Sequence, residues 1–210
     1  QASTPAEIQA MFDPMSYQKG GALLRMFETY FGEDFFRDGI RSYMRRYQFG
    51  NARAADLAAE LGGYPIRPVD AMMPSWLEKG GVPVVSVAVS PEDPSGRTLT
   101  LTQTRFSAFG LQDETLWDIP VRLRYRFGGD DKDRTMTWRL NERSATIRLY
   151  GPSRAADPAA HAPLWVYPNA GETGYYRVAL DESLLERALA RRGEMTPVER
   201  AGLINNLWAQ

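Results

Sequence analysis

The sequence contains no cysteine and a single histidine, His161. Without cysteine the chain forms no disulfide, which fits a cytoplasmic parent protein as well as a periplasmic or secreted one. Two imidazole ligands cannot come from one histidine, so a metal site that needs a pair of them is excluded. We therefore expect this chain to bind no metal by itself.

The sequence also lacks an excess of charge of either sign and any long hydrophobic run. The 25 basic and 26 acidic side chains nearly cancel, which leaves a formal charge of −1. Such a balance argues against nucleic acid or an anionic membrane as an obligate partner. No apolar run approaches the ~18 residues of a membrane span. The chain begins with Gln1 rather than methionine, so we expect the natural start, and any signal peptide, to lie upstream.

Hydrophobic residues make up 43% of the sequence, which is enough for a sizeable core. Up to about residue 82 they recur at helical spacing, as in Leu23, Met26 and Phe27. Between 83 and 182 the period changes to two, which predicts about seven short strands in an antiparallel β-sandwich. From 183 to 210 the helical period returns, and the T-P-V-E tetrapeptide beginning at Thr196 predicts a capped helix start.

The clearest predicted strand carries three arginines, Arg122, Arg124 and Arg126, in alternation with apolar residues. This stripe is open to interpretation as a nucleic-acid-binding face. No aromatic side chain interleaves it on the polar side, although stacking on aromatics is typical of such faces. We therefore expect a solvated face of the sheet opposite its apolar face.

The stretch around Tyr17 organises the first part of the chain. A proline-bearing turn leads into a predicted helix with Tyr17 at its entry, followed by Lys19 and two glycines. A phenol has an ordinary pKa near ~10, so it is neutral at pH 7 and donates one hydrogen bond. Tyr17 is therefore either a half-buried packing residue bonded to nearby backbone or a neutral donor directed at an oxyanion.

The pattern F-x-x-x-x-Y-x-K-G-G-A, from Phe12 to Ala22, resembles the tyrosine-bearing helix of the zinc aminopeptidases of the aminopeptidase N and puromycin-sensitive type. Later segments resemble the same family in the same order: G-E-D-F-F-R-D-G-I from Gly32, G-V-P-V-V-S-V from Gly81, L-T-Q-T-R-F from Leu101, W-D-I-P-V from Trp117 and G-Y-Y-R-V from Gly174. This ordered set extends the resemblance over nearly the whole chain.

The resemblance implies a multi-domain α + β fold. Residues 1–82 correspond to the helical C-terminal part of a thermolysin-like (gluzincin) catalytic domain, 83–182 to a β-sandwich domain, and 183–210 to the beginning of a C-terminal helical domain. In the family, neighbouring protein covers the stripe of Leu23, Met26 and Phe27 and part of the 184–208 region. We therefore expect uncovered apolar surface at both places and self-association through it.

The resemblance also implies an activity. The family removes amino-terminal residues from peptides: a zinc-bound water activated by a glutamate attacks the scissile carbonyl, and zinc and a phenol hold the oxyanion. By resemblance Tyr17 is that phenol, and Phe12 is an aromatic wall of the pocket for the substrate's first side chain. The zinc motif H-E-x-x-H requires two histidines and is absent here. We therefore expect a fragment of such an enzyme that is inactive alone, with a non-catalytic β-sandwich interaction or scaffolding module as the alternative.

Overall fold

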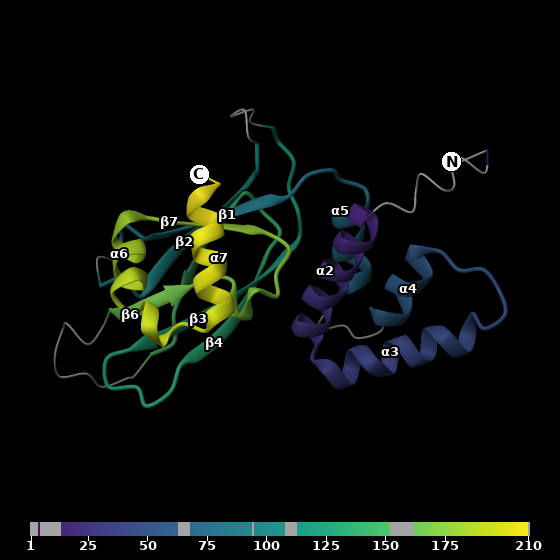
Figure 1. Ribbon diagram of the computed structural model, residues 1–210, viewed down its shortest axis with the longest axis horizontal. Coiled ribbons are helices and arrows are strands. Elements are labelled where there is room, and N and C mark those ends of the chain that lie inside the picture. The colour runs from purple at the N-terminus through teal and green to yellow at the C-terminus, as the bar shows by residue number, and fades with distance from the viewer. Residues whose placement is uncertain are drawn as a thin grey trace.

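The computed structural model describes residues 4, 14–62, 68–93, 95–107, 113–151 and 162–209, without the side chains of 14–16. From Pro14 to Leu77 the described residues form four helices: α2 (Pro14–Phe31), α3 (Glu33–Arg46), α4 (Ala54–Leu61) and α5 (Val69–Leu77). They form a group on one side of two β-sheets, and α6 (Glu182–Ala190) and α7 (Pro197–Trp208) follow the last strand (Figure 1). None of the described helices is long and apolar enough to cross a membrane.

Seven strands of the described residues build two sheets, as the change of period predicts. One sheet has the order β5-β2-β1-β7, from β1 (Pro83–Val89), β2 (Thr98–Arg105), β5 (Ser144–Arg148) and β7 (Arg177–Leu180). The other has the order β4-β3-β6, from β3 (Ile119–Phe127), β4 (Arg134–Leu140) and β6 (Pro163–Tyr167). Their inward-facing apolar side chains belong to one hydrophobic cluster, so the mixed α + β architecture is confirmed.

The prediction of an antiparallel sandwich needs one correction. Strands β1 and β7 are parallel, with Val84 opposite Arg177 and Val87 opposite Leu180, whereas the other four strand pairs are antiparallel. Antiparallel neighbours can be joined by a short hairpin, but parallel neighbours need a long crossover. Because β1 and β7 are the first and last strands of the sandwich, the segment from β2 to β6 connects them and serves as that crossover.

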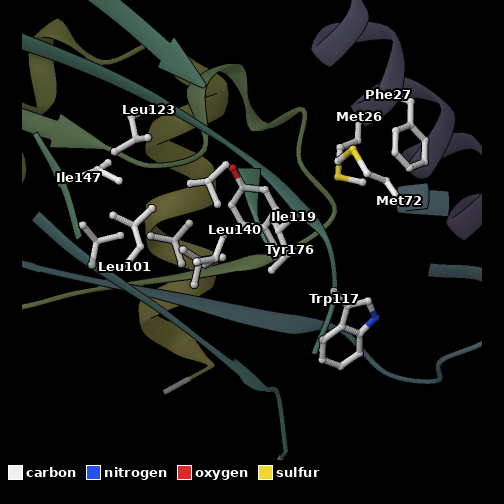
Figure 2. Packing of buried hydrophobic residues seen from close by; sticks show 14 of the residues in the cluster. Met26, Phe27, Met72, Leu101, Trp117, Ile119, Leu123, Leu140, Ile147 and Tyr176 are labelled. Atoms are coloured by element: carbon white, nitrogen blue, oxygen red, sulfur yellow. The ribbon is translucent and has the colours of Figure 1, made fainter. Parts of the chain in front are cut away.

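The hydrophobic core is continuous from the helices into the sheets. Figure 2 shows Met26, Phe27 and Met72 of the helices on one side, and Leu101, Leu123 and Ile147 of the strands on the other. Trp117 and Tyr176 lie between the two groups in the same cluster. The helical part is therefore held on the sandwich by apolar burial.

Hydrogen bonds reinforce this junction. The indole Nε1 of Trp76 on α5 donates to the carbonyl of Asp118 at 2.9 Å, and the Asp118 amide donates to Ser75 Oγ at 3.1 Å. Gln103 of β2 is fully buried, and its amide nitrogen and oxygen both bond to the backbone of Trp117, at 2.9 and 2.8 Å. Every bond here satisfies a group that would be costly to bury unpaired.

The apolar stripe of Leu23, Met26 and Phe27 is buried within this chain, so the prediction that it is uncovered is wrong. Helical spacing shows that a stripe faces a core but not which element supplies that core, and here α5 and the 175–176 region supply it. The second predicted surface is present on α7, where Ile204 is 64% and Trp208 is 91% exposed. Self-association stays a prediction for this face of α7 alone.

The arginine stripe of β3 also differs from the prediction. Its side chains do not form a solvated face, because Arg124 and Arg126 lie under the C-terminal helices in a half-buried ion-pair network. The guanidinium of Arg124 pairs with Glu199 of α7 and stacks 4.8 Å from the centre of the Trp165 ring. Trp165 lies on the neighbouring strand β6, where alternation along β3 alone does not reveal it.

The capping box predicted at the start of α7 is confirmed. The Thr196 hydroxyl accepts from the Glu199 amide at 3.3 Å, and the Glu199 carboxylate accepts from the Thr196 amide at 2.9 Å. Replacing Thr196 with alanine removes one cap bond and should lower the free energy of unfolding by ~1 kcal/mol in urea titrations. Thr196→Ser keeps the acceptor and should stay near wild type; equal destabilisation by both changes would contradict a capping role.

Candidate functional site

Tyr17 lies in the first turn of α2, the position that the sequence pattern predicts for it. Its side chain is 65% exposed, on the face of the helix that is turned away from the core. The hypothesis of a half-buried packing tyrosine therefore loses its main support. The exposed phenol is placed on a rigid element while remaining accessible to other groups.

The opposite face of α2 fixes the helix. Nine residues separate Tyr17 from Met26, which is two and a half turns at ~3.6 residues per turn, so the two side chains leave opposite sides of the helix. Leu23, Met26 and Phe27 are buried, and the Tyr175 amide donates to the sulfur of Met26 at 3.4 Å. A displacement of Tyr17 relative to the sandwich would have to disrupt this packing.

Two glycines, Gly20 and Gly21, lie on the same side of α2 as Tyr17. A Cβ placed on Gly20 or Gly21 would meet no heavy atom within 4 Å among the described residues. Lys19, two residues after Tyr17, donates from Nζ to the carbonyl of Lys79 at 3.4 Å. The glycine pair therefore leaves room beside Tyr17 that no described part of this chain fills.

The amino end of α2 contributes a partial positive charge beside Tyr17. Tyr17 is near the amino end of an 18-residue helix whose first turn holds no acidic residue. The aligned peptide dipoles leave partial positive charge at such an end, which favours a nearby anion. A neutral donor and a positive helix end are together suited to a negative charge that develops on an oxygen atom.

Comparison with known proteins adds independent information. Residues 1–76 match the family model described as "Peptidase family M1 domain". The chain is 32% identical over 205 residues to "Probable M1 family aminopeptidase 1" of Encephalitozoon cuniculi, a match that covers 97% of this chain and 21% of that protein. It is also 32% identical over 205 residues to "Tricorn protease-interacting factor F2" of Thermoplasma acidophilum, covering 98% of this chain and 23% of that one. A "Leucyl aminopeptidase" of Saccharolobus solfataricus is 30% identical over 208 residues, a match that covers 98% of this chain and 23% of that protein.

The chain belongs to the M1 peptidase family. The resemblance stated from the sequence motifs is thereby confirmed, as is its extension over nearly the whole chain. This M1 chain spans about a fifth of the length of the curated relatives that it matches.

The structure places only one of the two predicted site residues of the M1 chain. Tyr17 is on α2, whereas Phe12 lies outside the described residues, as does His161. Phe12 is five residues before Tyr17 in the sequence. Its role as a pocket wall stays a prediction.

Metal-ligating side chains do not cluster in the described part of the M1 chain. No group of three or more histidine, cysteine, aspartate or glutamate side chains there is arranged to hold a metal ion. A zinc site of the family's kind needs three protein ligands around one ion. The described residues therefore do not fit a zinc ion, and any such site would have to be built from other residues.

Two residues attach the end of the helical part to the sandwich through hydrogen bonds that the sequence does not reveal. Trp76 and Lys79 attach the end of α5 to the 116–118 segment, through Nε1 to the Asp118 carbonyl and through Nζ to the Leu116 carbonyl at 2.6 Å. The Lys79 carbonyl in turn receives Lys19 from α2. These pairs lie 37 to 60 residues apart, so no local pattern connects them.

Proposed function

We propose that this M1 chain supplies the oxyanion-stabilising phenol of a zinc-dependent aminopeptidase, a longer protein that removes amino-terminal residues from peptides. The observation that carries the proposal is Tyr17, an exposed phenol on the open face of a helix whose other face is buried. The aminopeptidase names of the relatives support the same reading. In this proposal 1–82 complete the catalytic domain, 83–182 form a β-sandwich domain and 183–210 begin a helical domain.

In this proposal two residues of the chain, Tyr17 and Phe12, act on the substrate. Tyr17 donates one hydrogen bond to the oxygen that becomes negative when the scissile carbonyl is attacked. The core contacts of α2 hold the donor in place, so little reorganisation is needed when the charge develops. Phe12 forms one wall of the pocket for the substrate's first side chain.

The zinc ion and the attacking water lie with other residues in this proposal. The described residues offer no ligand cluster, and the sequence offers only one histidine. An H-E-x-x-H motif within a few tens of residues upstream of Gln1 in the natural protein would support the enzyme. A natural start near Gln1 without that motif would instead favour the non-catalytic β-sandwich module.

The 210-residue chain alone should be inactive. Even a well-placed oxyanion donor has no effect without a nucleophile, so added zinc should give no hydrolysis of an aminoacyl anilide. The longer protein that contains this chain should hydrolyse the same substrate and lose activity to a chelator. Chelator-sensitive turnover by the 210-residue chain itself would refute the proposed division of labour.

A further inference from the structure

A cavity of about 240 Å³ lies on the outer face of the β5-β2-β1-β7 sheet, beside the last turn of α7. Strand register builds its floor, because Thr104, Val84 and Arg177 lie opposite one another on β2, β1 and β7. Side chains that are paired across strands share one face of a sheet. Figure 1 shows the end of α7 beside β7, the edge strand of this sheet. Asn206 and Ala209 of this end line the cavity.

Arg177 is the unusual residue of this cavity. Its guanidinium stacks 4.4 Å from the centre of the Phe106 ring, and its side chain is half-buried. It forms no ion pair with any carboxylate of the described residues. A partly desolvated cation without a counter-charge is unfavourable, and stacking leaves the edge of the guanidinium plane ready for a planar anion.

Two further polar side chains of the cavity, Arg105 and Asn206, can donate hydrogen bonds. Arg105 lines it while its Nη1 pairs with Asp113 at 2.7 Å, and its Nε lies against Gly81, where an added Cβ would come within 2.8 Å. Asn206 uses its Oδ1 to accept from the Val178 amide at 3.2 Å, so the amide nitrogen is the end available to a ligand. Among the described residues no acidic side chain lines the cavity, and because Asp113 offsets the charge of Arg105, Arg177 supplies the net positive charge there.

We propose that this cavity is a binding site for a small carboxylate, with Arg177 as its main ligand and Arg105 and Asn206 as supporting donors. The lining also includes the apolar side chains of Val84 and Phe106, which suit a short hydrocarbon part, and the hydroxyl groups of Thr104 and Ser107. The volume is below the ~300–1,000 Å³ of sites for drug-sized molecules, which favours a small organic acid. This site lies on the sandwich, not on α2, and the proposal does not depend on the role of Tyr17.

The test is a titration of the 210-residue chain with sodium succinate at constant ionic strength, followed by NMR of the arginine Nε–H groups and by calorimetry. Succinate should bind saturably with a dissociation constant of roughly 1 mM, and sodium chloride should not compete at equal ionic strength. Arg177→Gln should weaken binding about tenfold or more, because it removes a charge-assisted bidentate donor. Arg45→Gln, which removes an exposed arginine of α3, should bind as the wild type does.

A second pair of variants separates loss of the ligand from loss of the fold. Arg177→Lys keeps the charge but loses the planar fork, so it should bind more weakly than wild type and more tightly than Arg177→Gln. Phe106→Leu removes the stacking surface and should also weaken binding. Circular dichroism identifies any variant that fails to fold, and only the affinities of the folded variants are used to test the proposal. Absence of saturable binding to wild type, equal competition by chloride, or unchanged affinity in the folded Arg177 variants would overturn the proposal.

Discussion

Replacing Tyr17 with phenylalanine in the longer, zinc-loaded protein should lower kcat by about 10²–10³, or roughly 3–4 kcal/mol of transition-state stabilisation. The change keeps the ring and deletes only the donor. The hydroxyl should be closer to the tetrahedral oxyanion than to the flat ground-state carbonyl. Its loss should therefore lower kcat and kcat/KM together and leave KM little changed.

Two further variants in the same protein make the result specific. Phe12→Ala removes a proposed pocket wall, so it should alter which first residue is preferred while the chemical step is spared. Tyr150→Phe deletes the hydroxyl of a tyrosine that is 75% exposed on the sandwich, and activity should be unchanged. Steady-state kinetics on a series of aminoacyl anilides measures all three. If folded Tyr17→Phe retains near-normal kcat, Tyr17 is a packing or surface residue and its assignment by resemblance is wrong.

The geometry explains why this substitution should leave the fold intact. Tyr17 is largely exposed, and neither Gly20 nor Gly21 beside it has a described neighbour that the ring must support. The helix is held from its other side by Met26 and Phe27, which the change does not touch. A large loss of activity with an unchanged free energy of unfolding is therefore the expected combination.

Local sequence signals predicted local structure well. The alternation from Pro83 to Leu180 gave seven strands, and the T-P-V-E tetrapeptide at Thr196 gave a capping box, because both patterns depend on residues within one element. The start of α5 is less clear from such signals, because the helix begins at Val69 with Pro68 before it, and Asp70 lies in its first turn rather than at the cap. An acid near a helix start is favoured by the dipole at either position, so the residue type does not distinguish them.

Long-range partners were beyond the reach of these signals. Arg124 was expected in solvent because its strand alternates, yet its partner Glu199 comes 75 residues later and its stacking partner Trp165 lies on another strand. In the same way, periodicity showed that Met26 faces a core but not that this chain itself provides it. Alternation reports which face of an element is apolar, whereas what covers the polar face depends on the topology.

Glu199 is the centre of the network that joins α7 to the sheet. Its side chain is 1% exposed and accepts from Arg124 Nε at 3.0 Å, from the Gly171 amide at 2.9 Å and from the Thr196 amide at 2.9 Å. Burial alone would raise the pKa of Glu199, but these hydrogen bonds and the charge of Arg124 lower it below its ordinary value. The carboxylate is therefore the form that the folded state favours.

The pH dependence follows from the sign of that shift. Because the pKa of Glu199 is lower in the folded chain than in the unfolded one, its contribution is fully present above the unfolded value. It is lost as the pH falls through the folded value, so acid should loosen α7. The neighbouring Glu172 behaves in the opposite way, since burial and then the charge of Glu199 raise its pKa, although Tyr167 donates to it.

Replacing Glu199 with alanine should therefore lower the free energy of unfolding by roughly 3–5 kcal/mol at pH 7, because it leaves Arg124 half-buried with Asp133 alone, at 2.5 Å. Urea titration followed by circular dichroism measures the loss, and hydrogen exchange should show it first in the amides of α7. Glu186→Ala, at an exposed position of α6, should stay within ~0.5 kcal/mol of wild type. The stability of Glu199→Ala should also fall less than that of the wild type as the pH is lowered, because the carboxylate that titrates is gone.

A change below ~1 kcal/mol at pH 7 for Glu199→Ala, with α7 still protected, would mean that the apolar contacts of Leu203 and Met195 hold the helix without the ion pair.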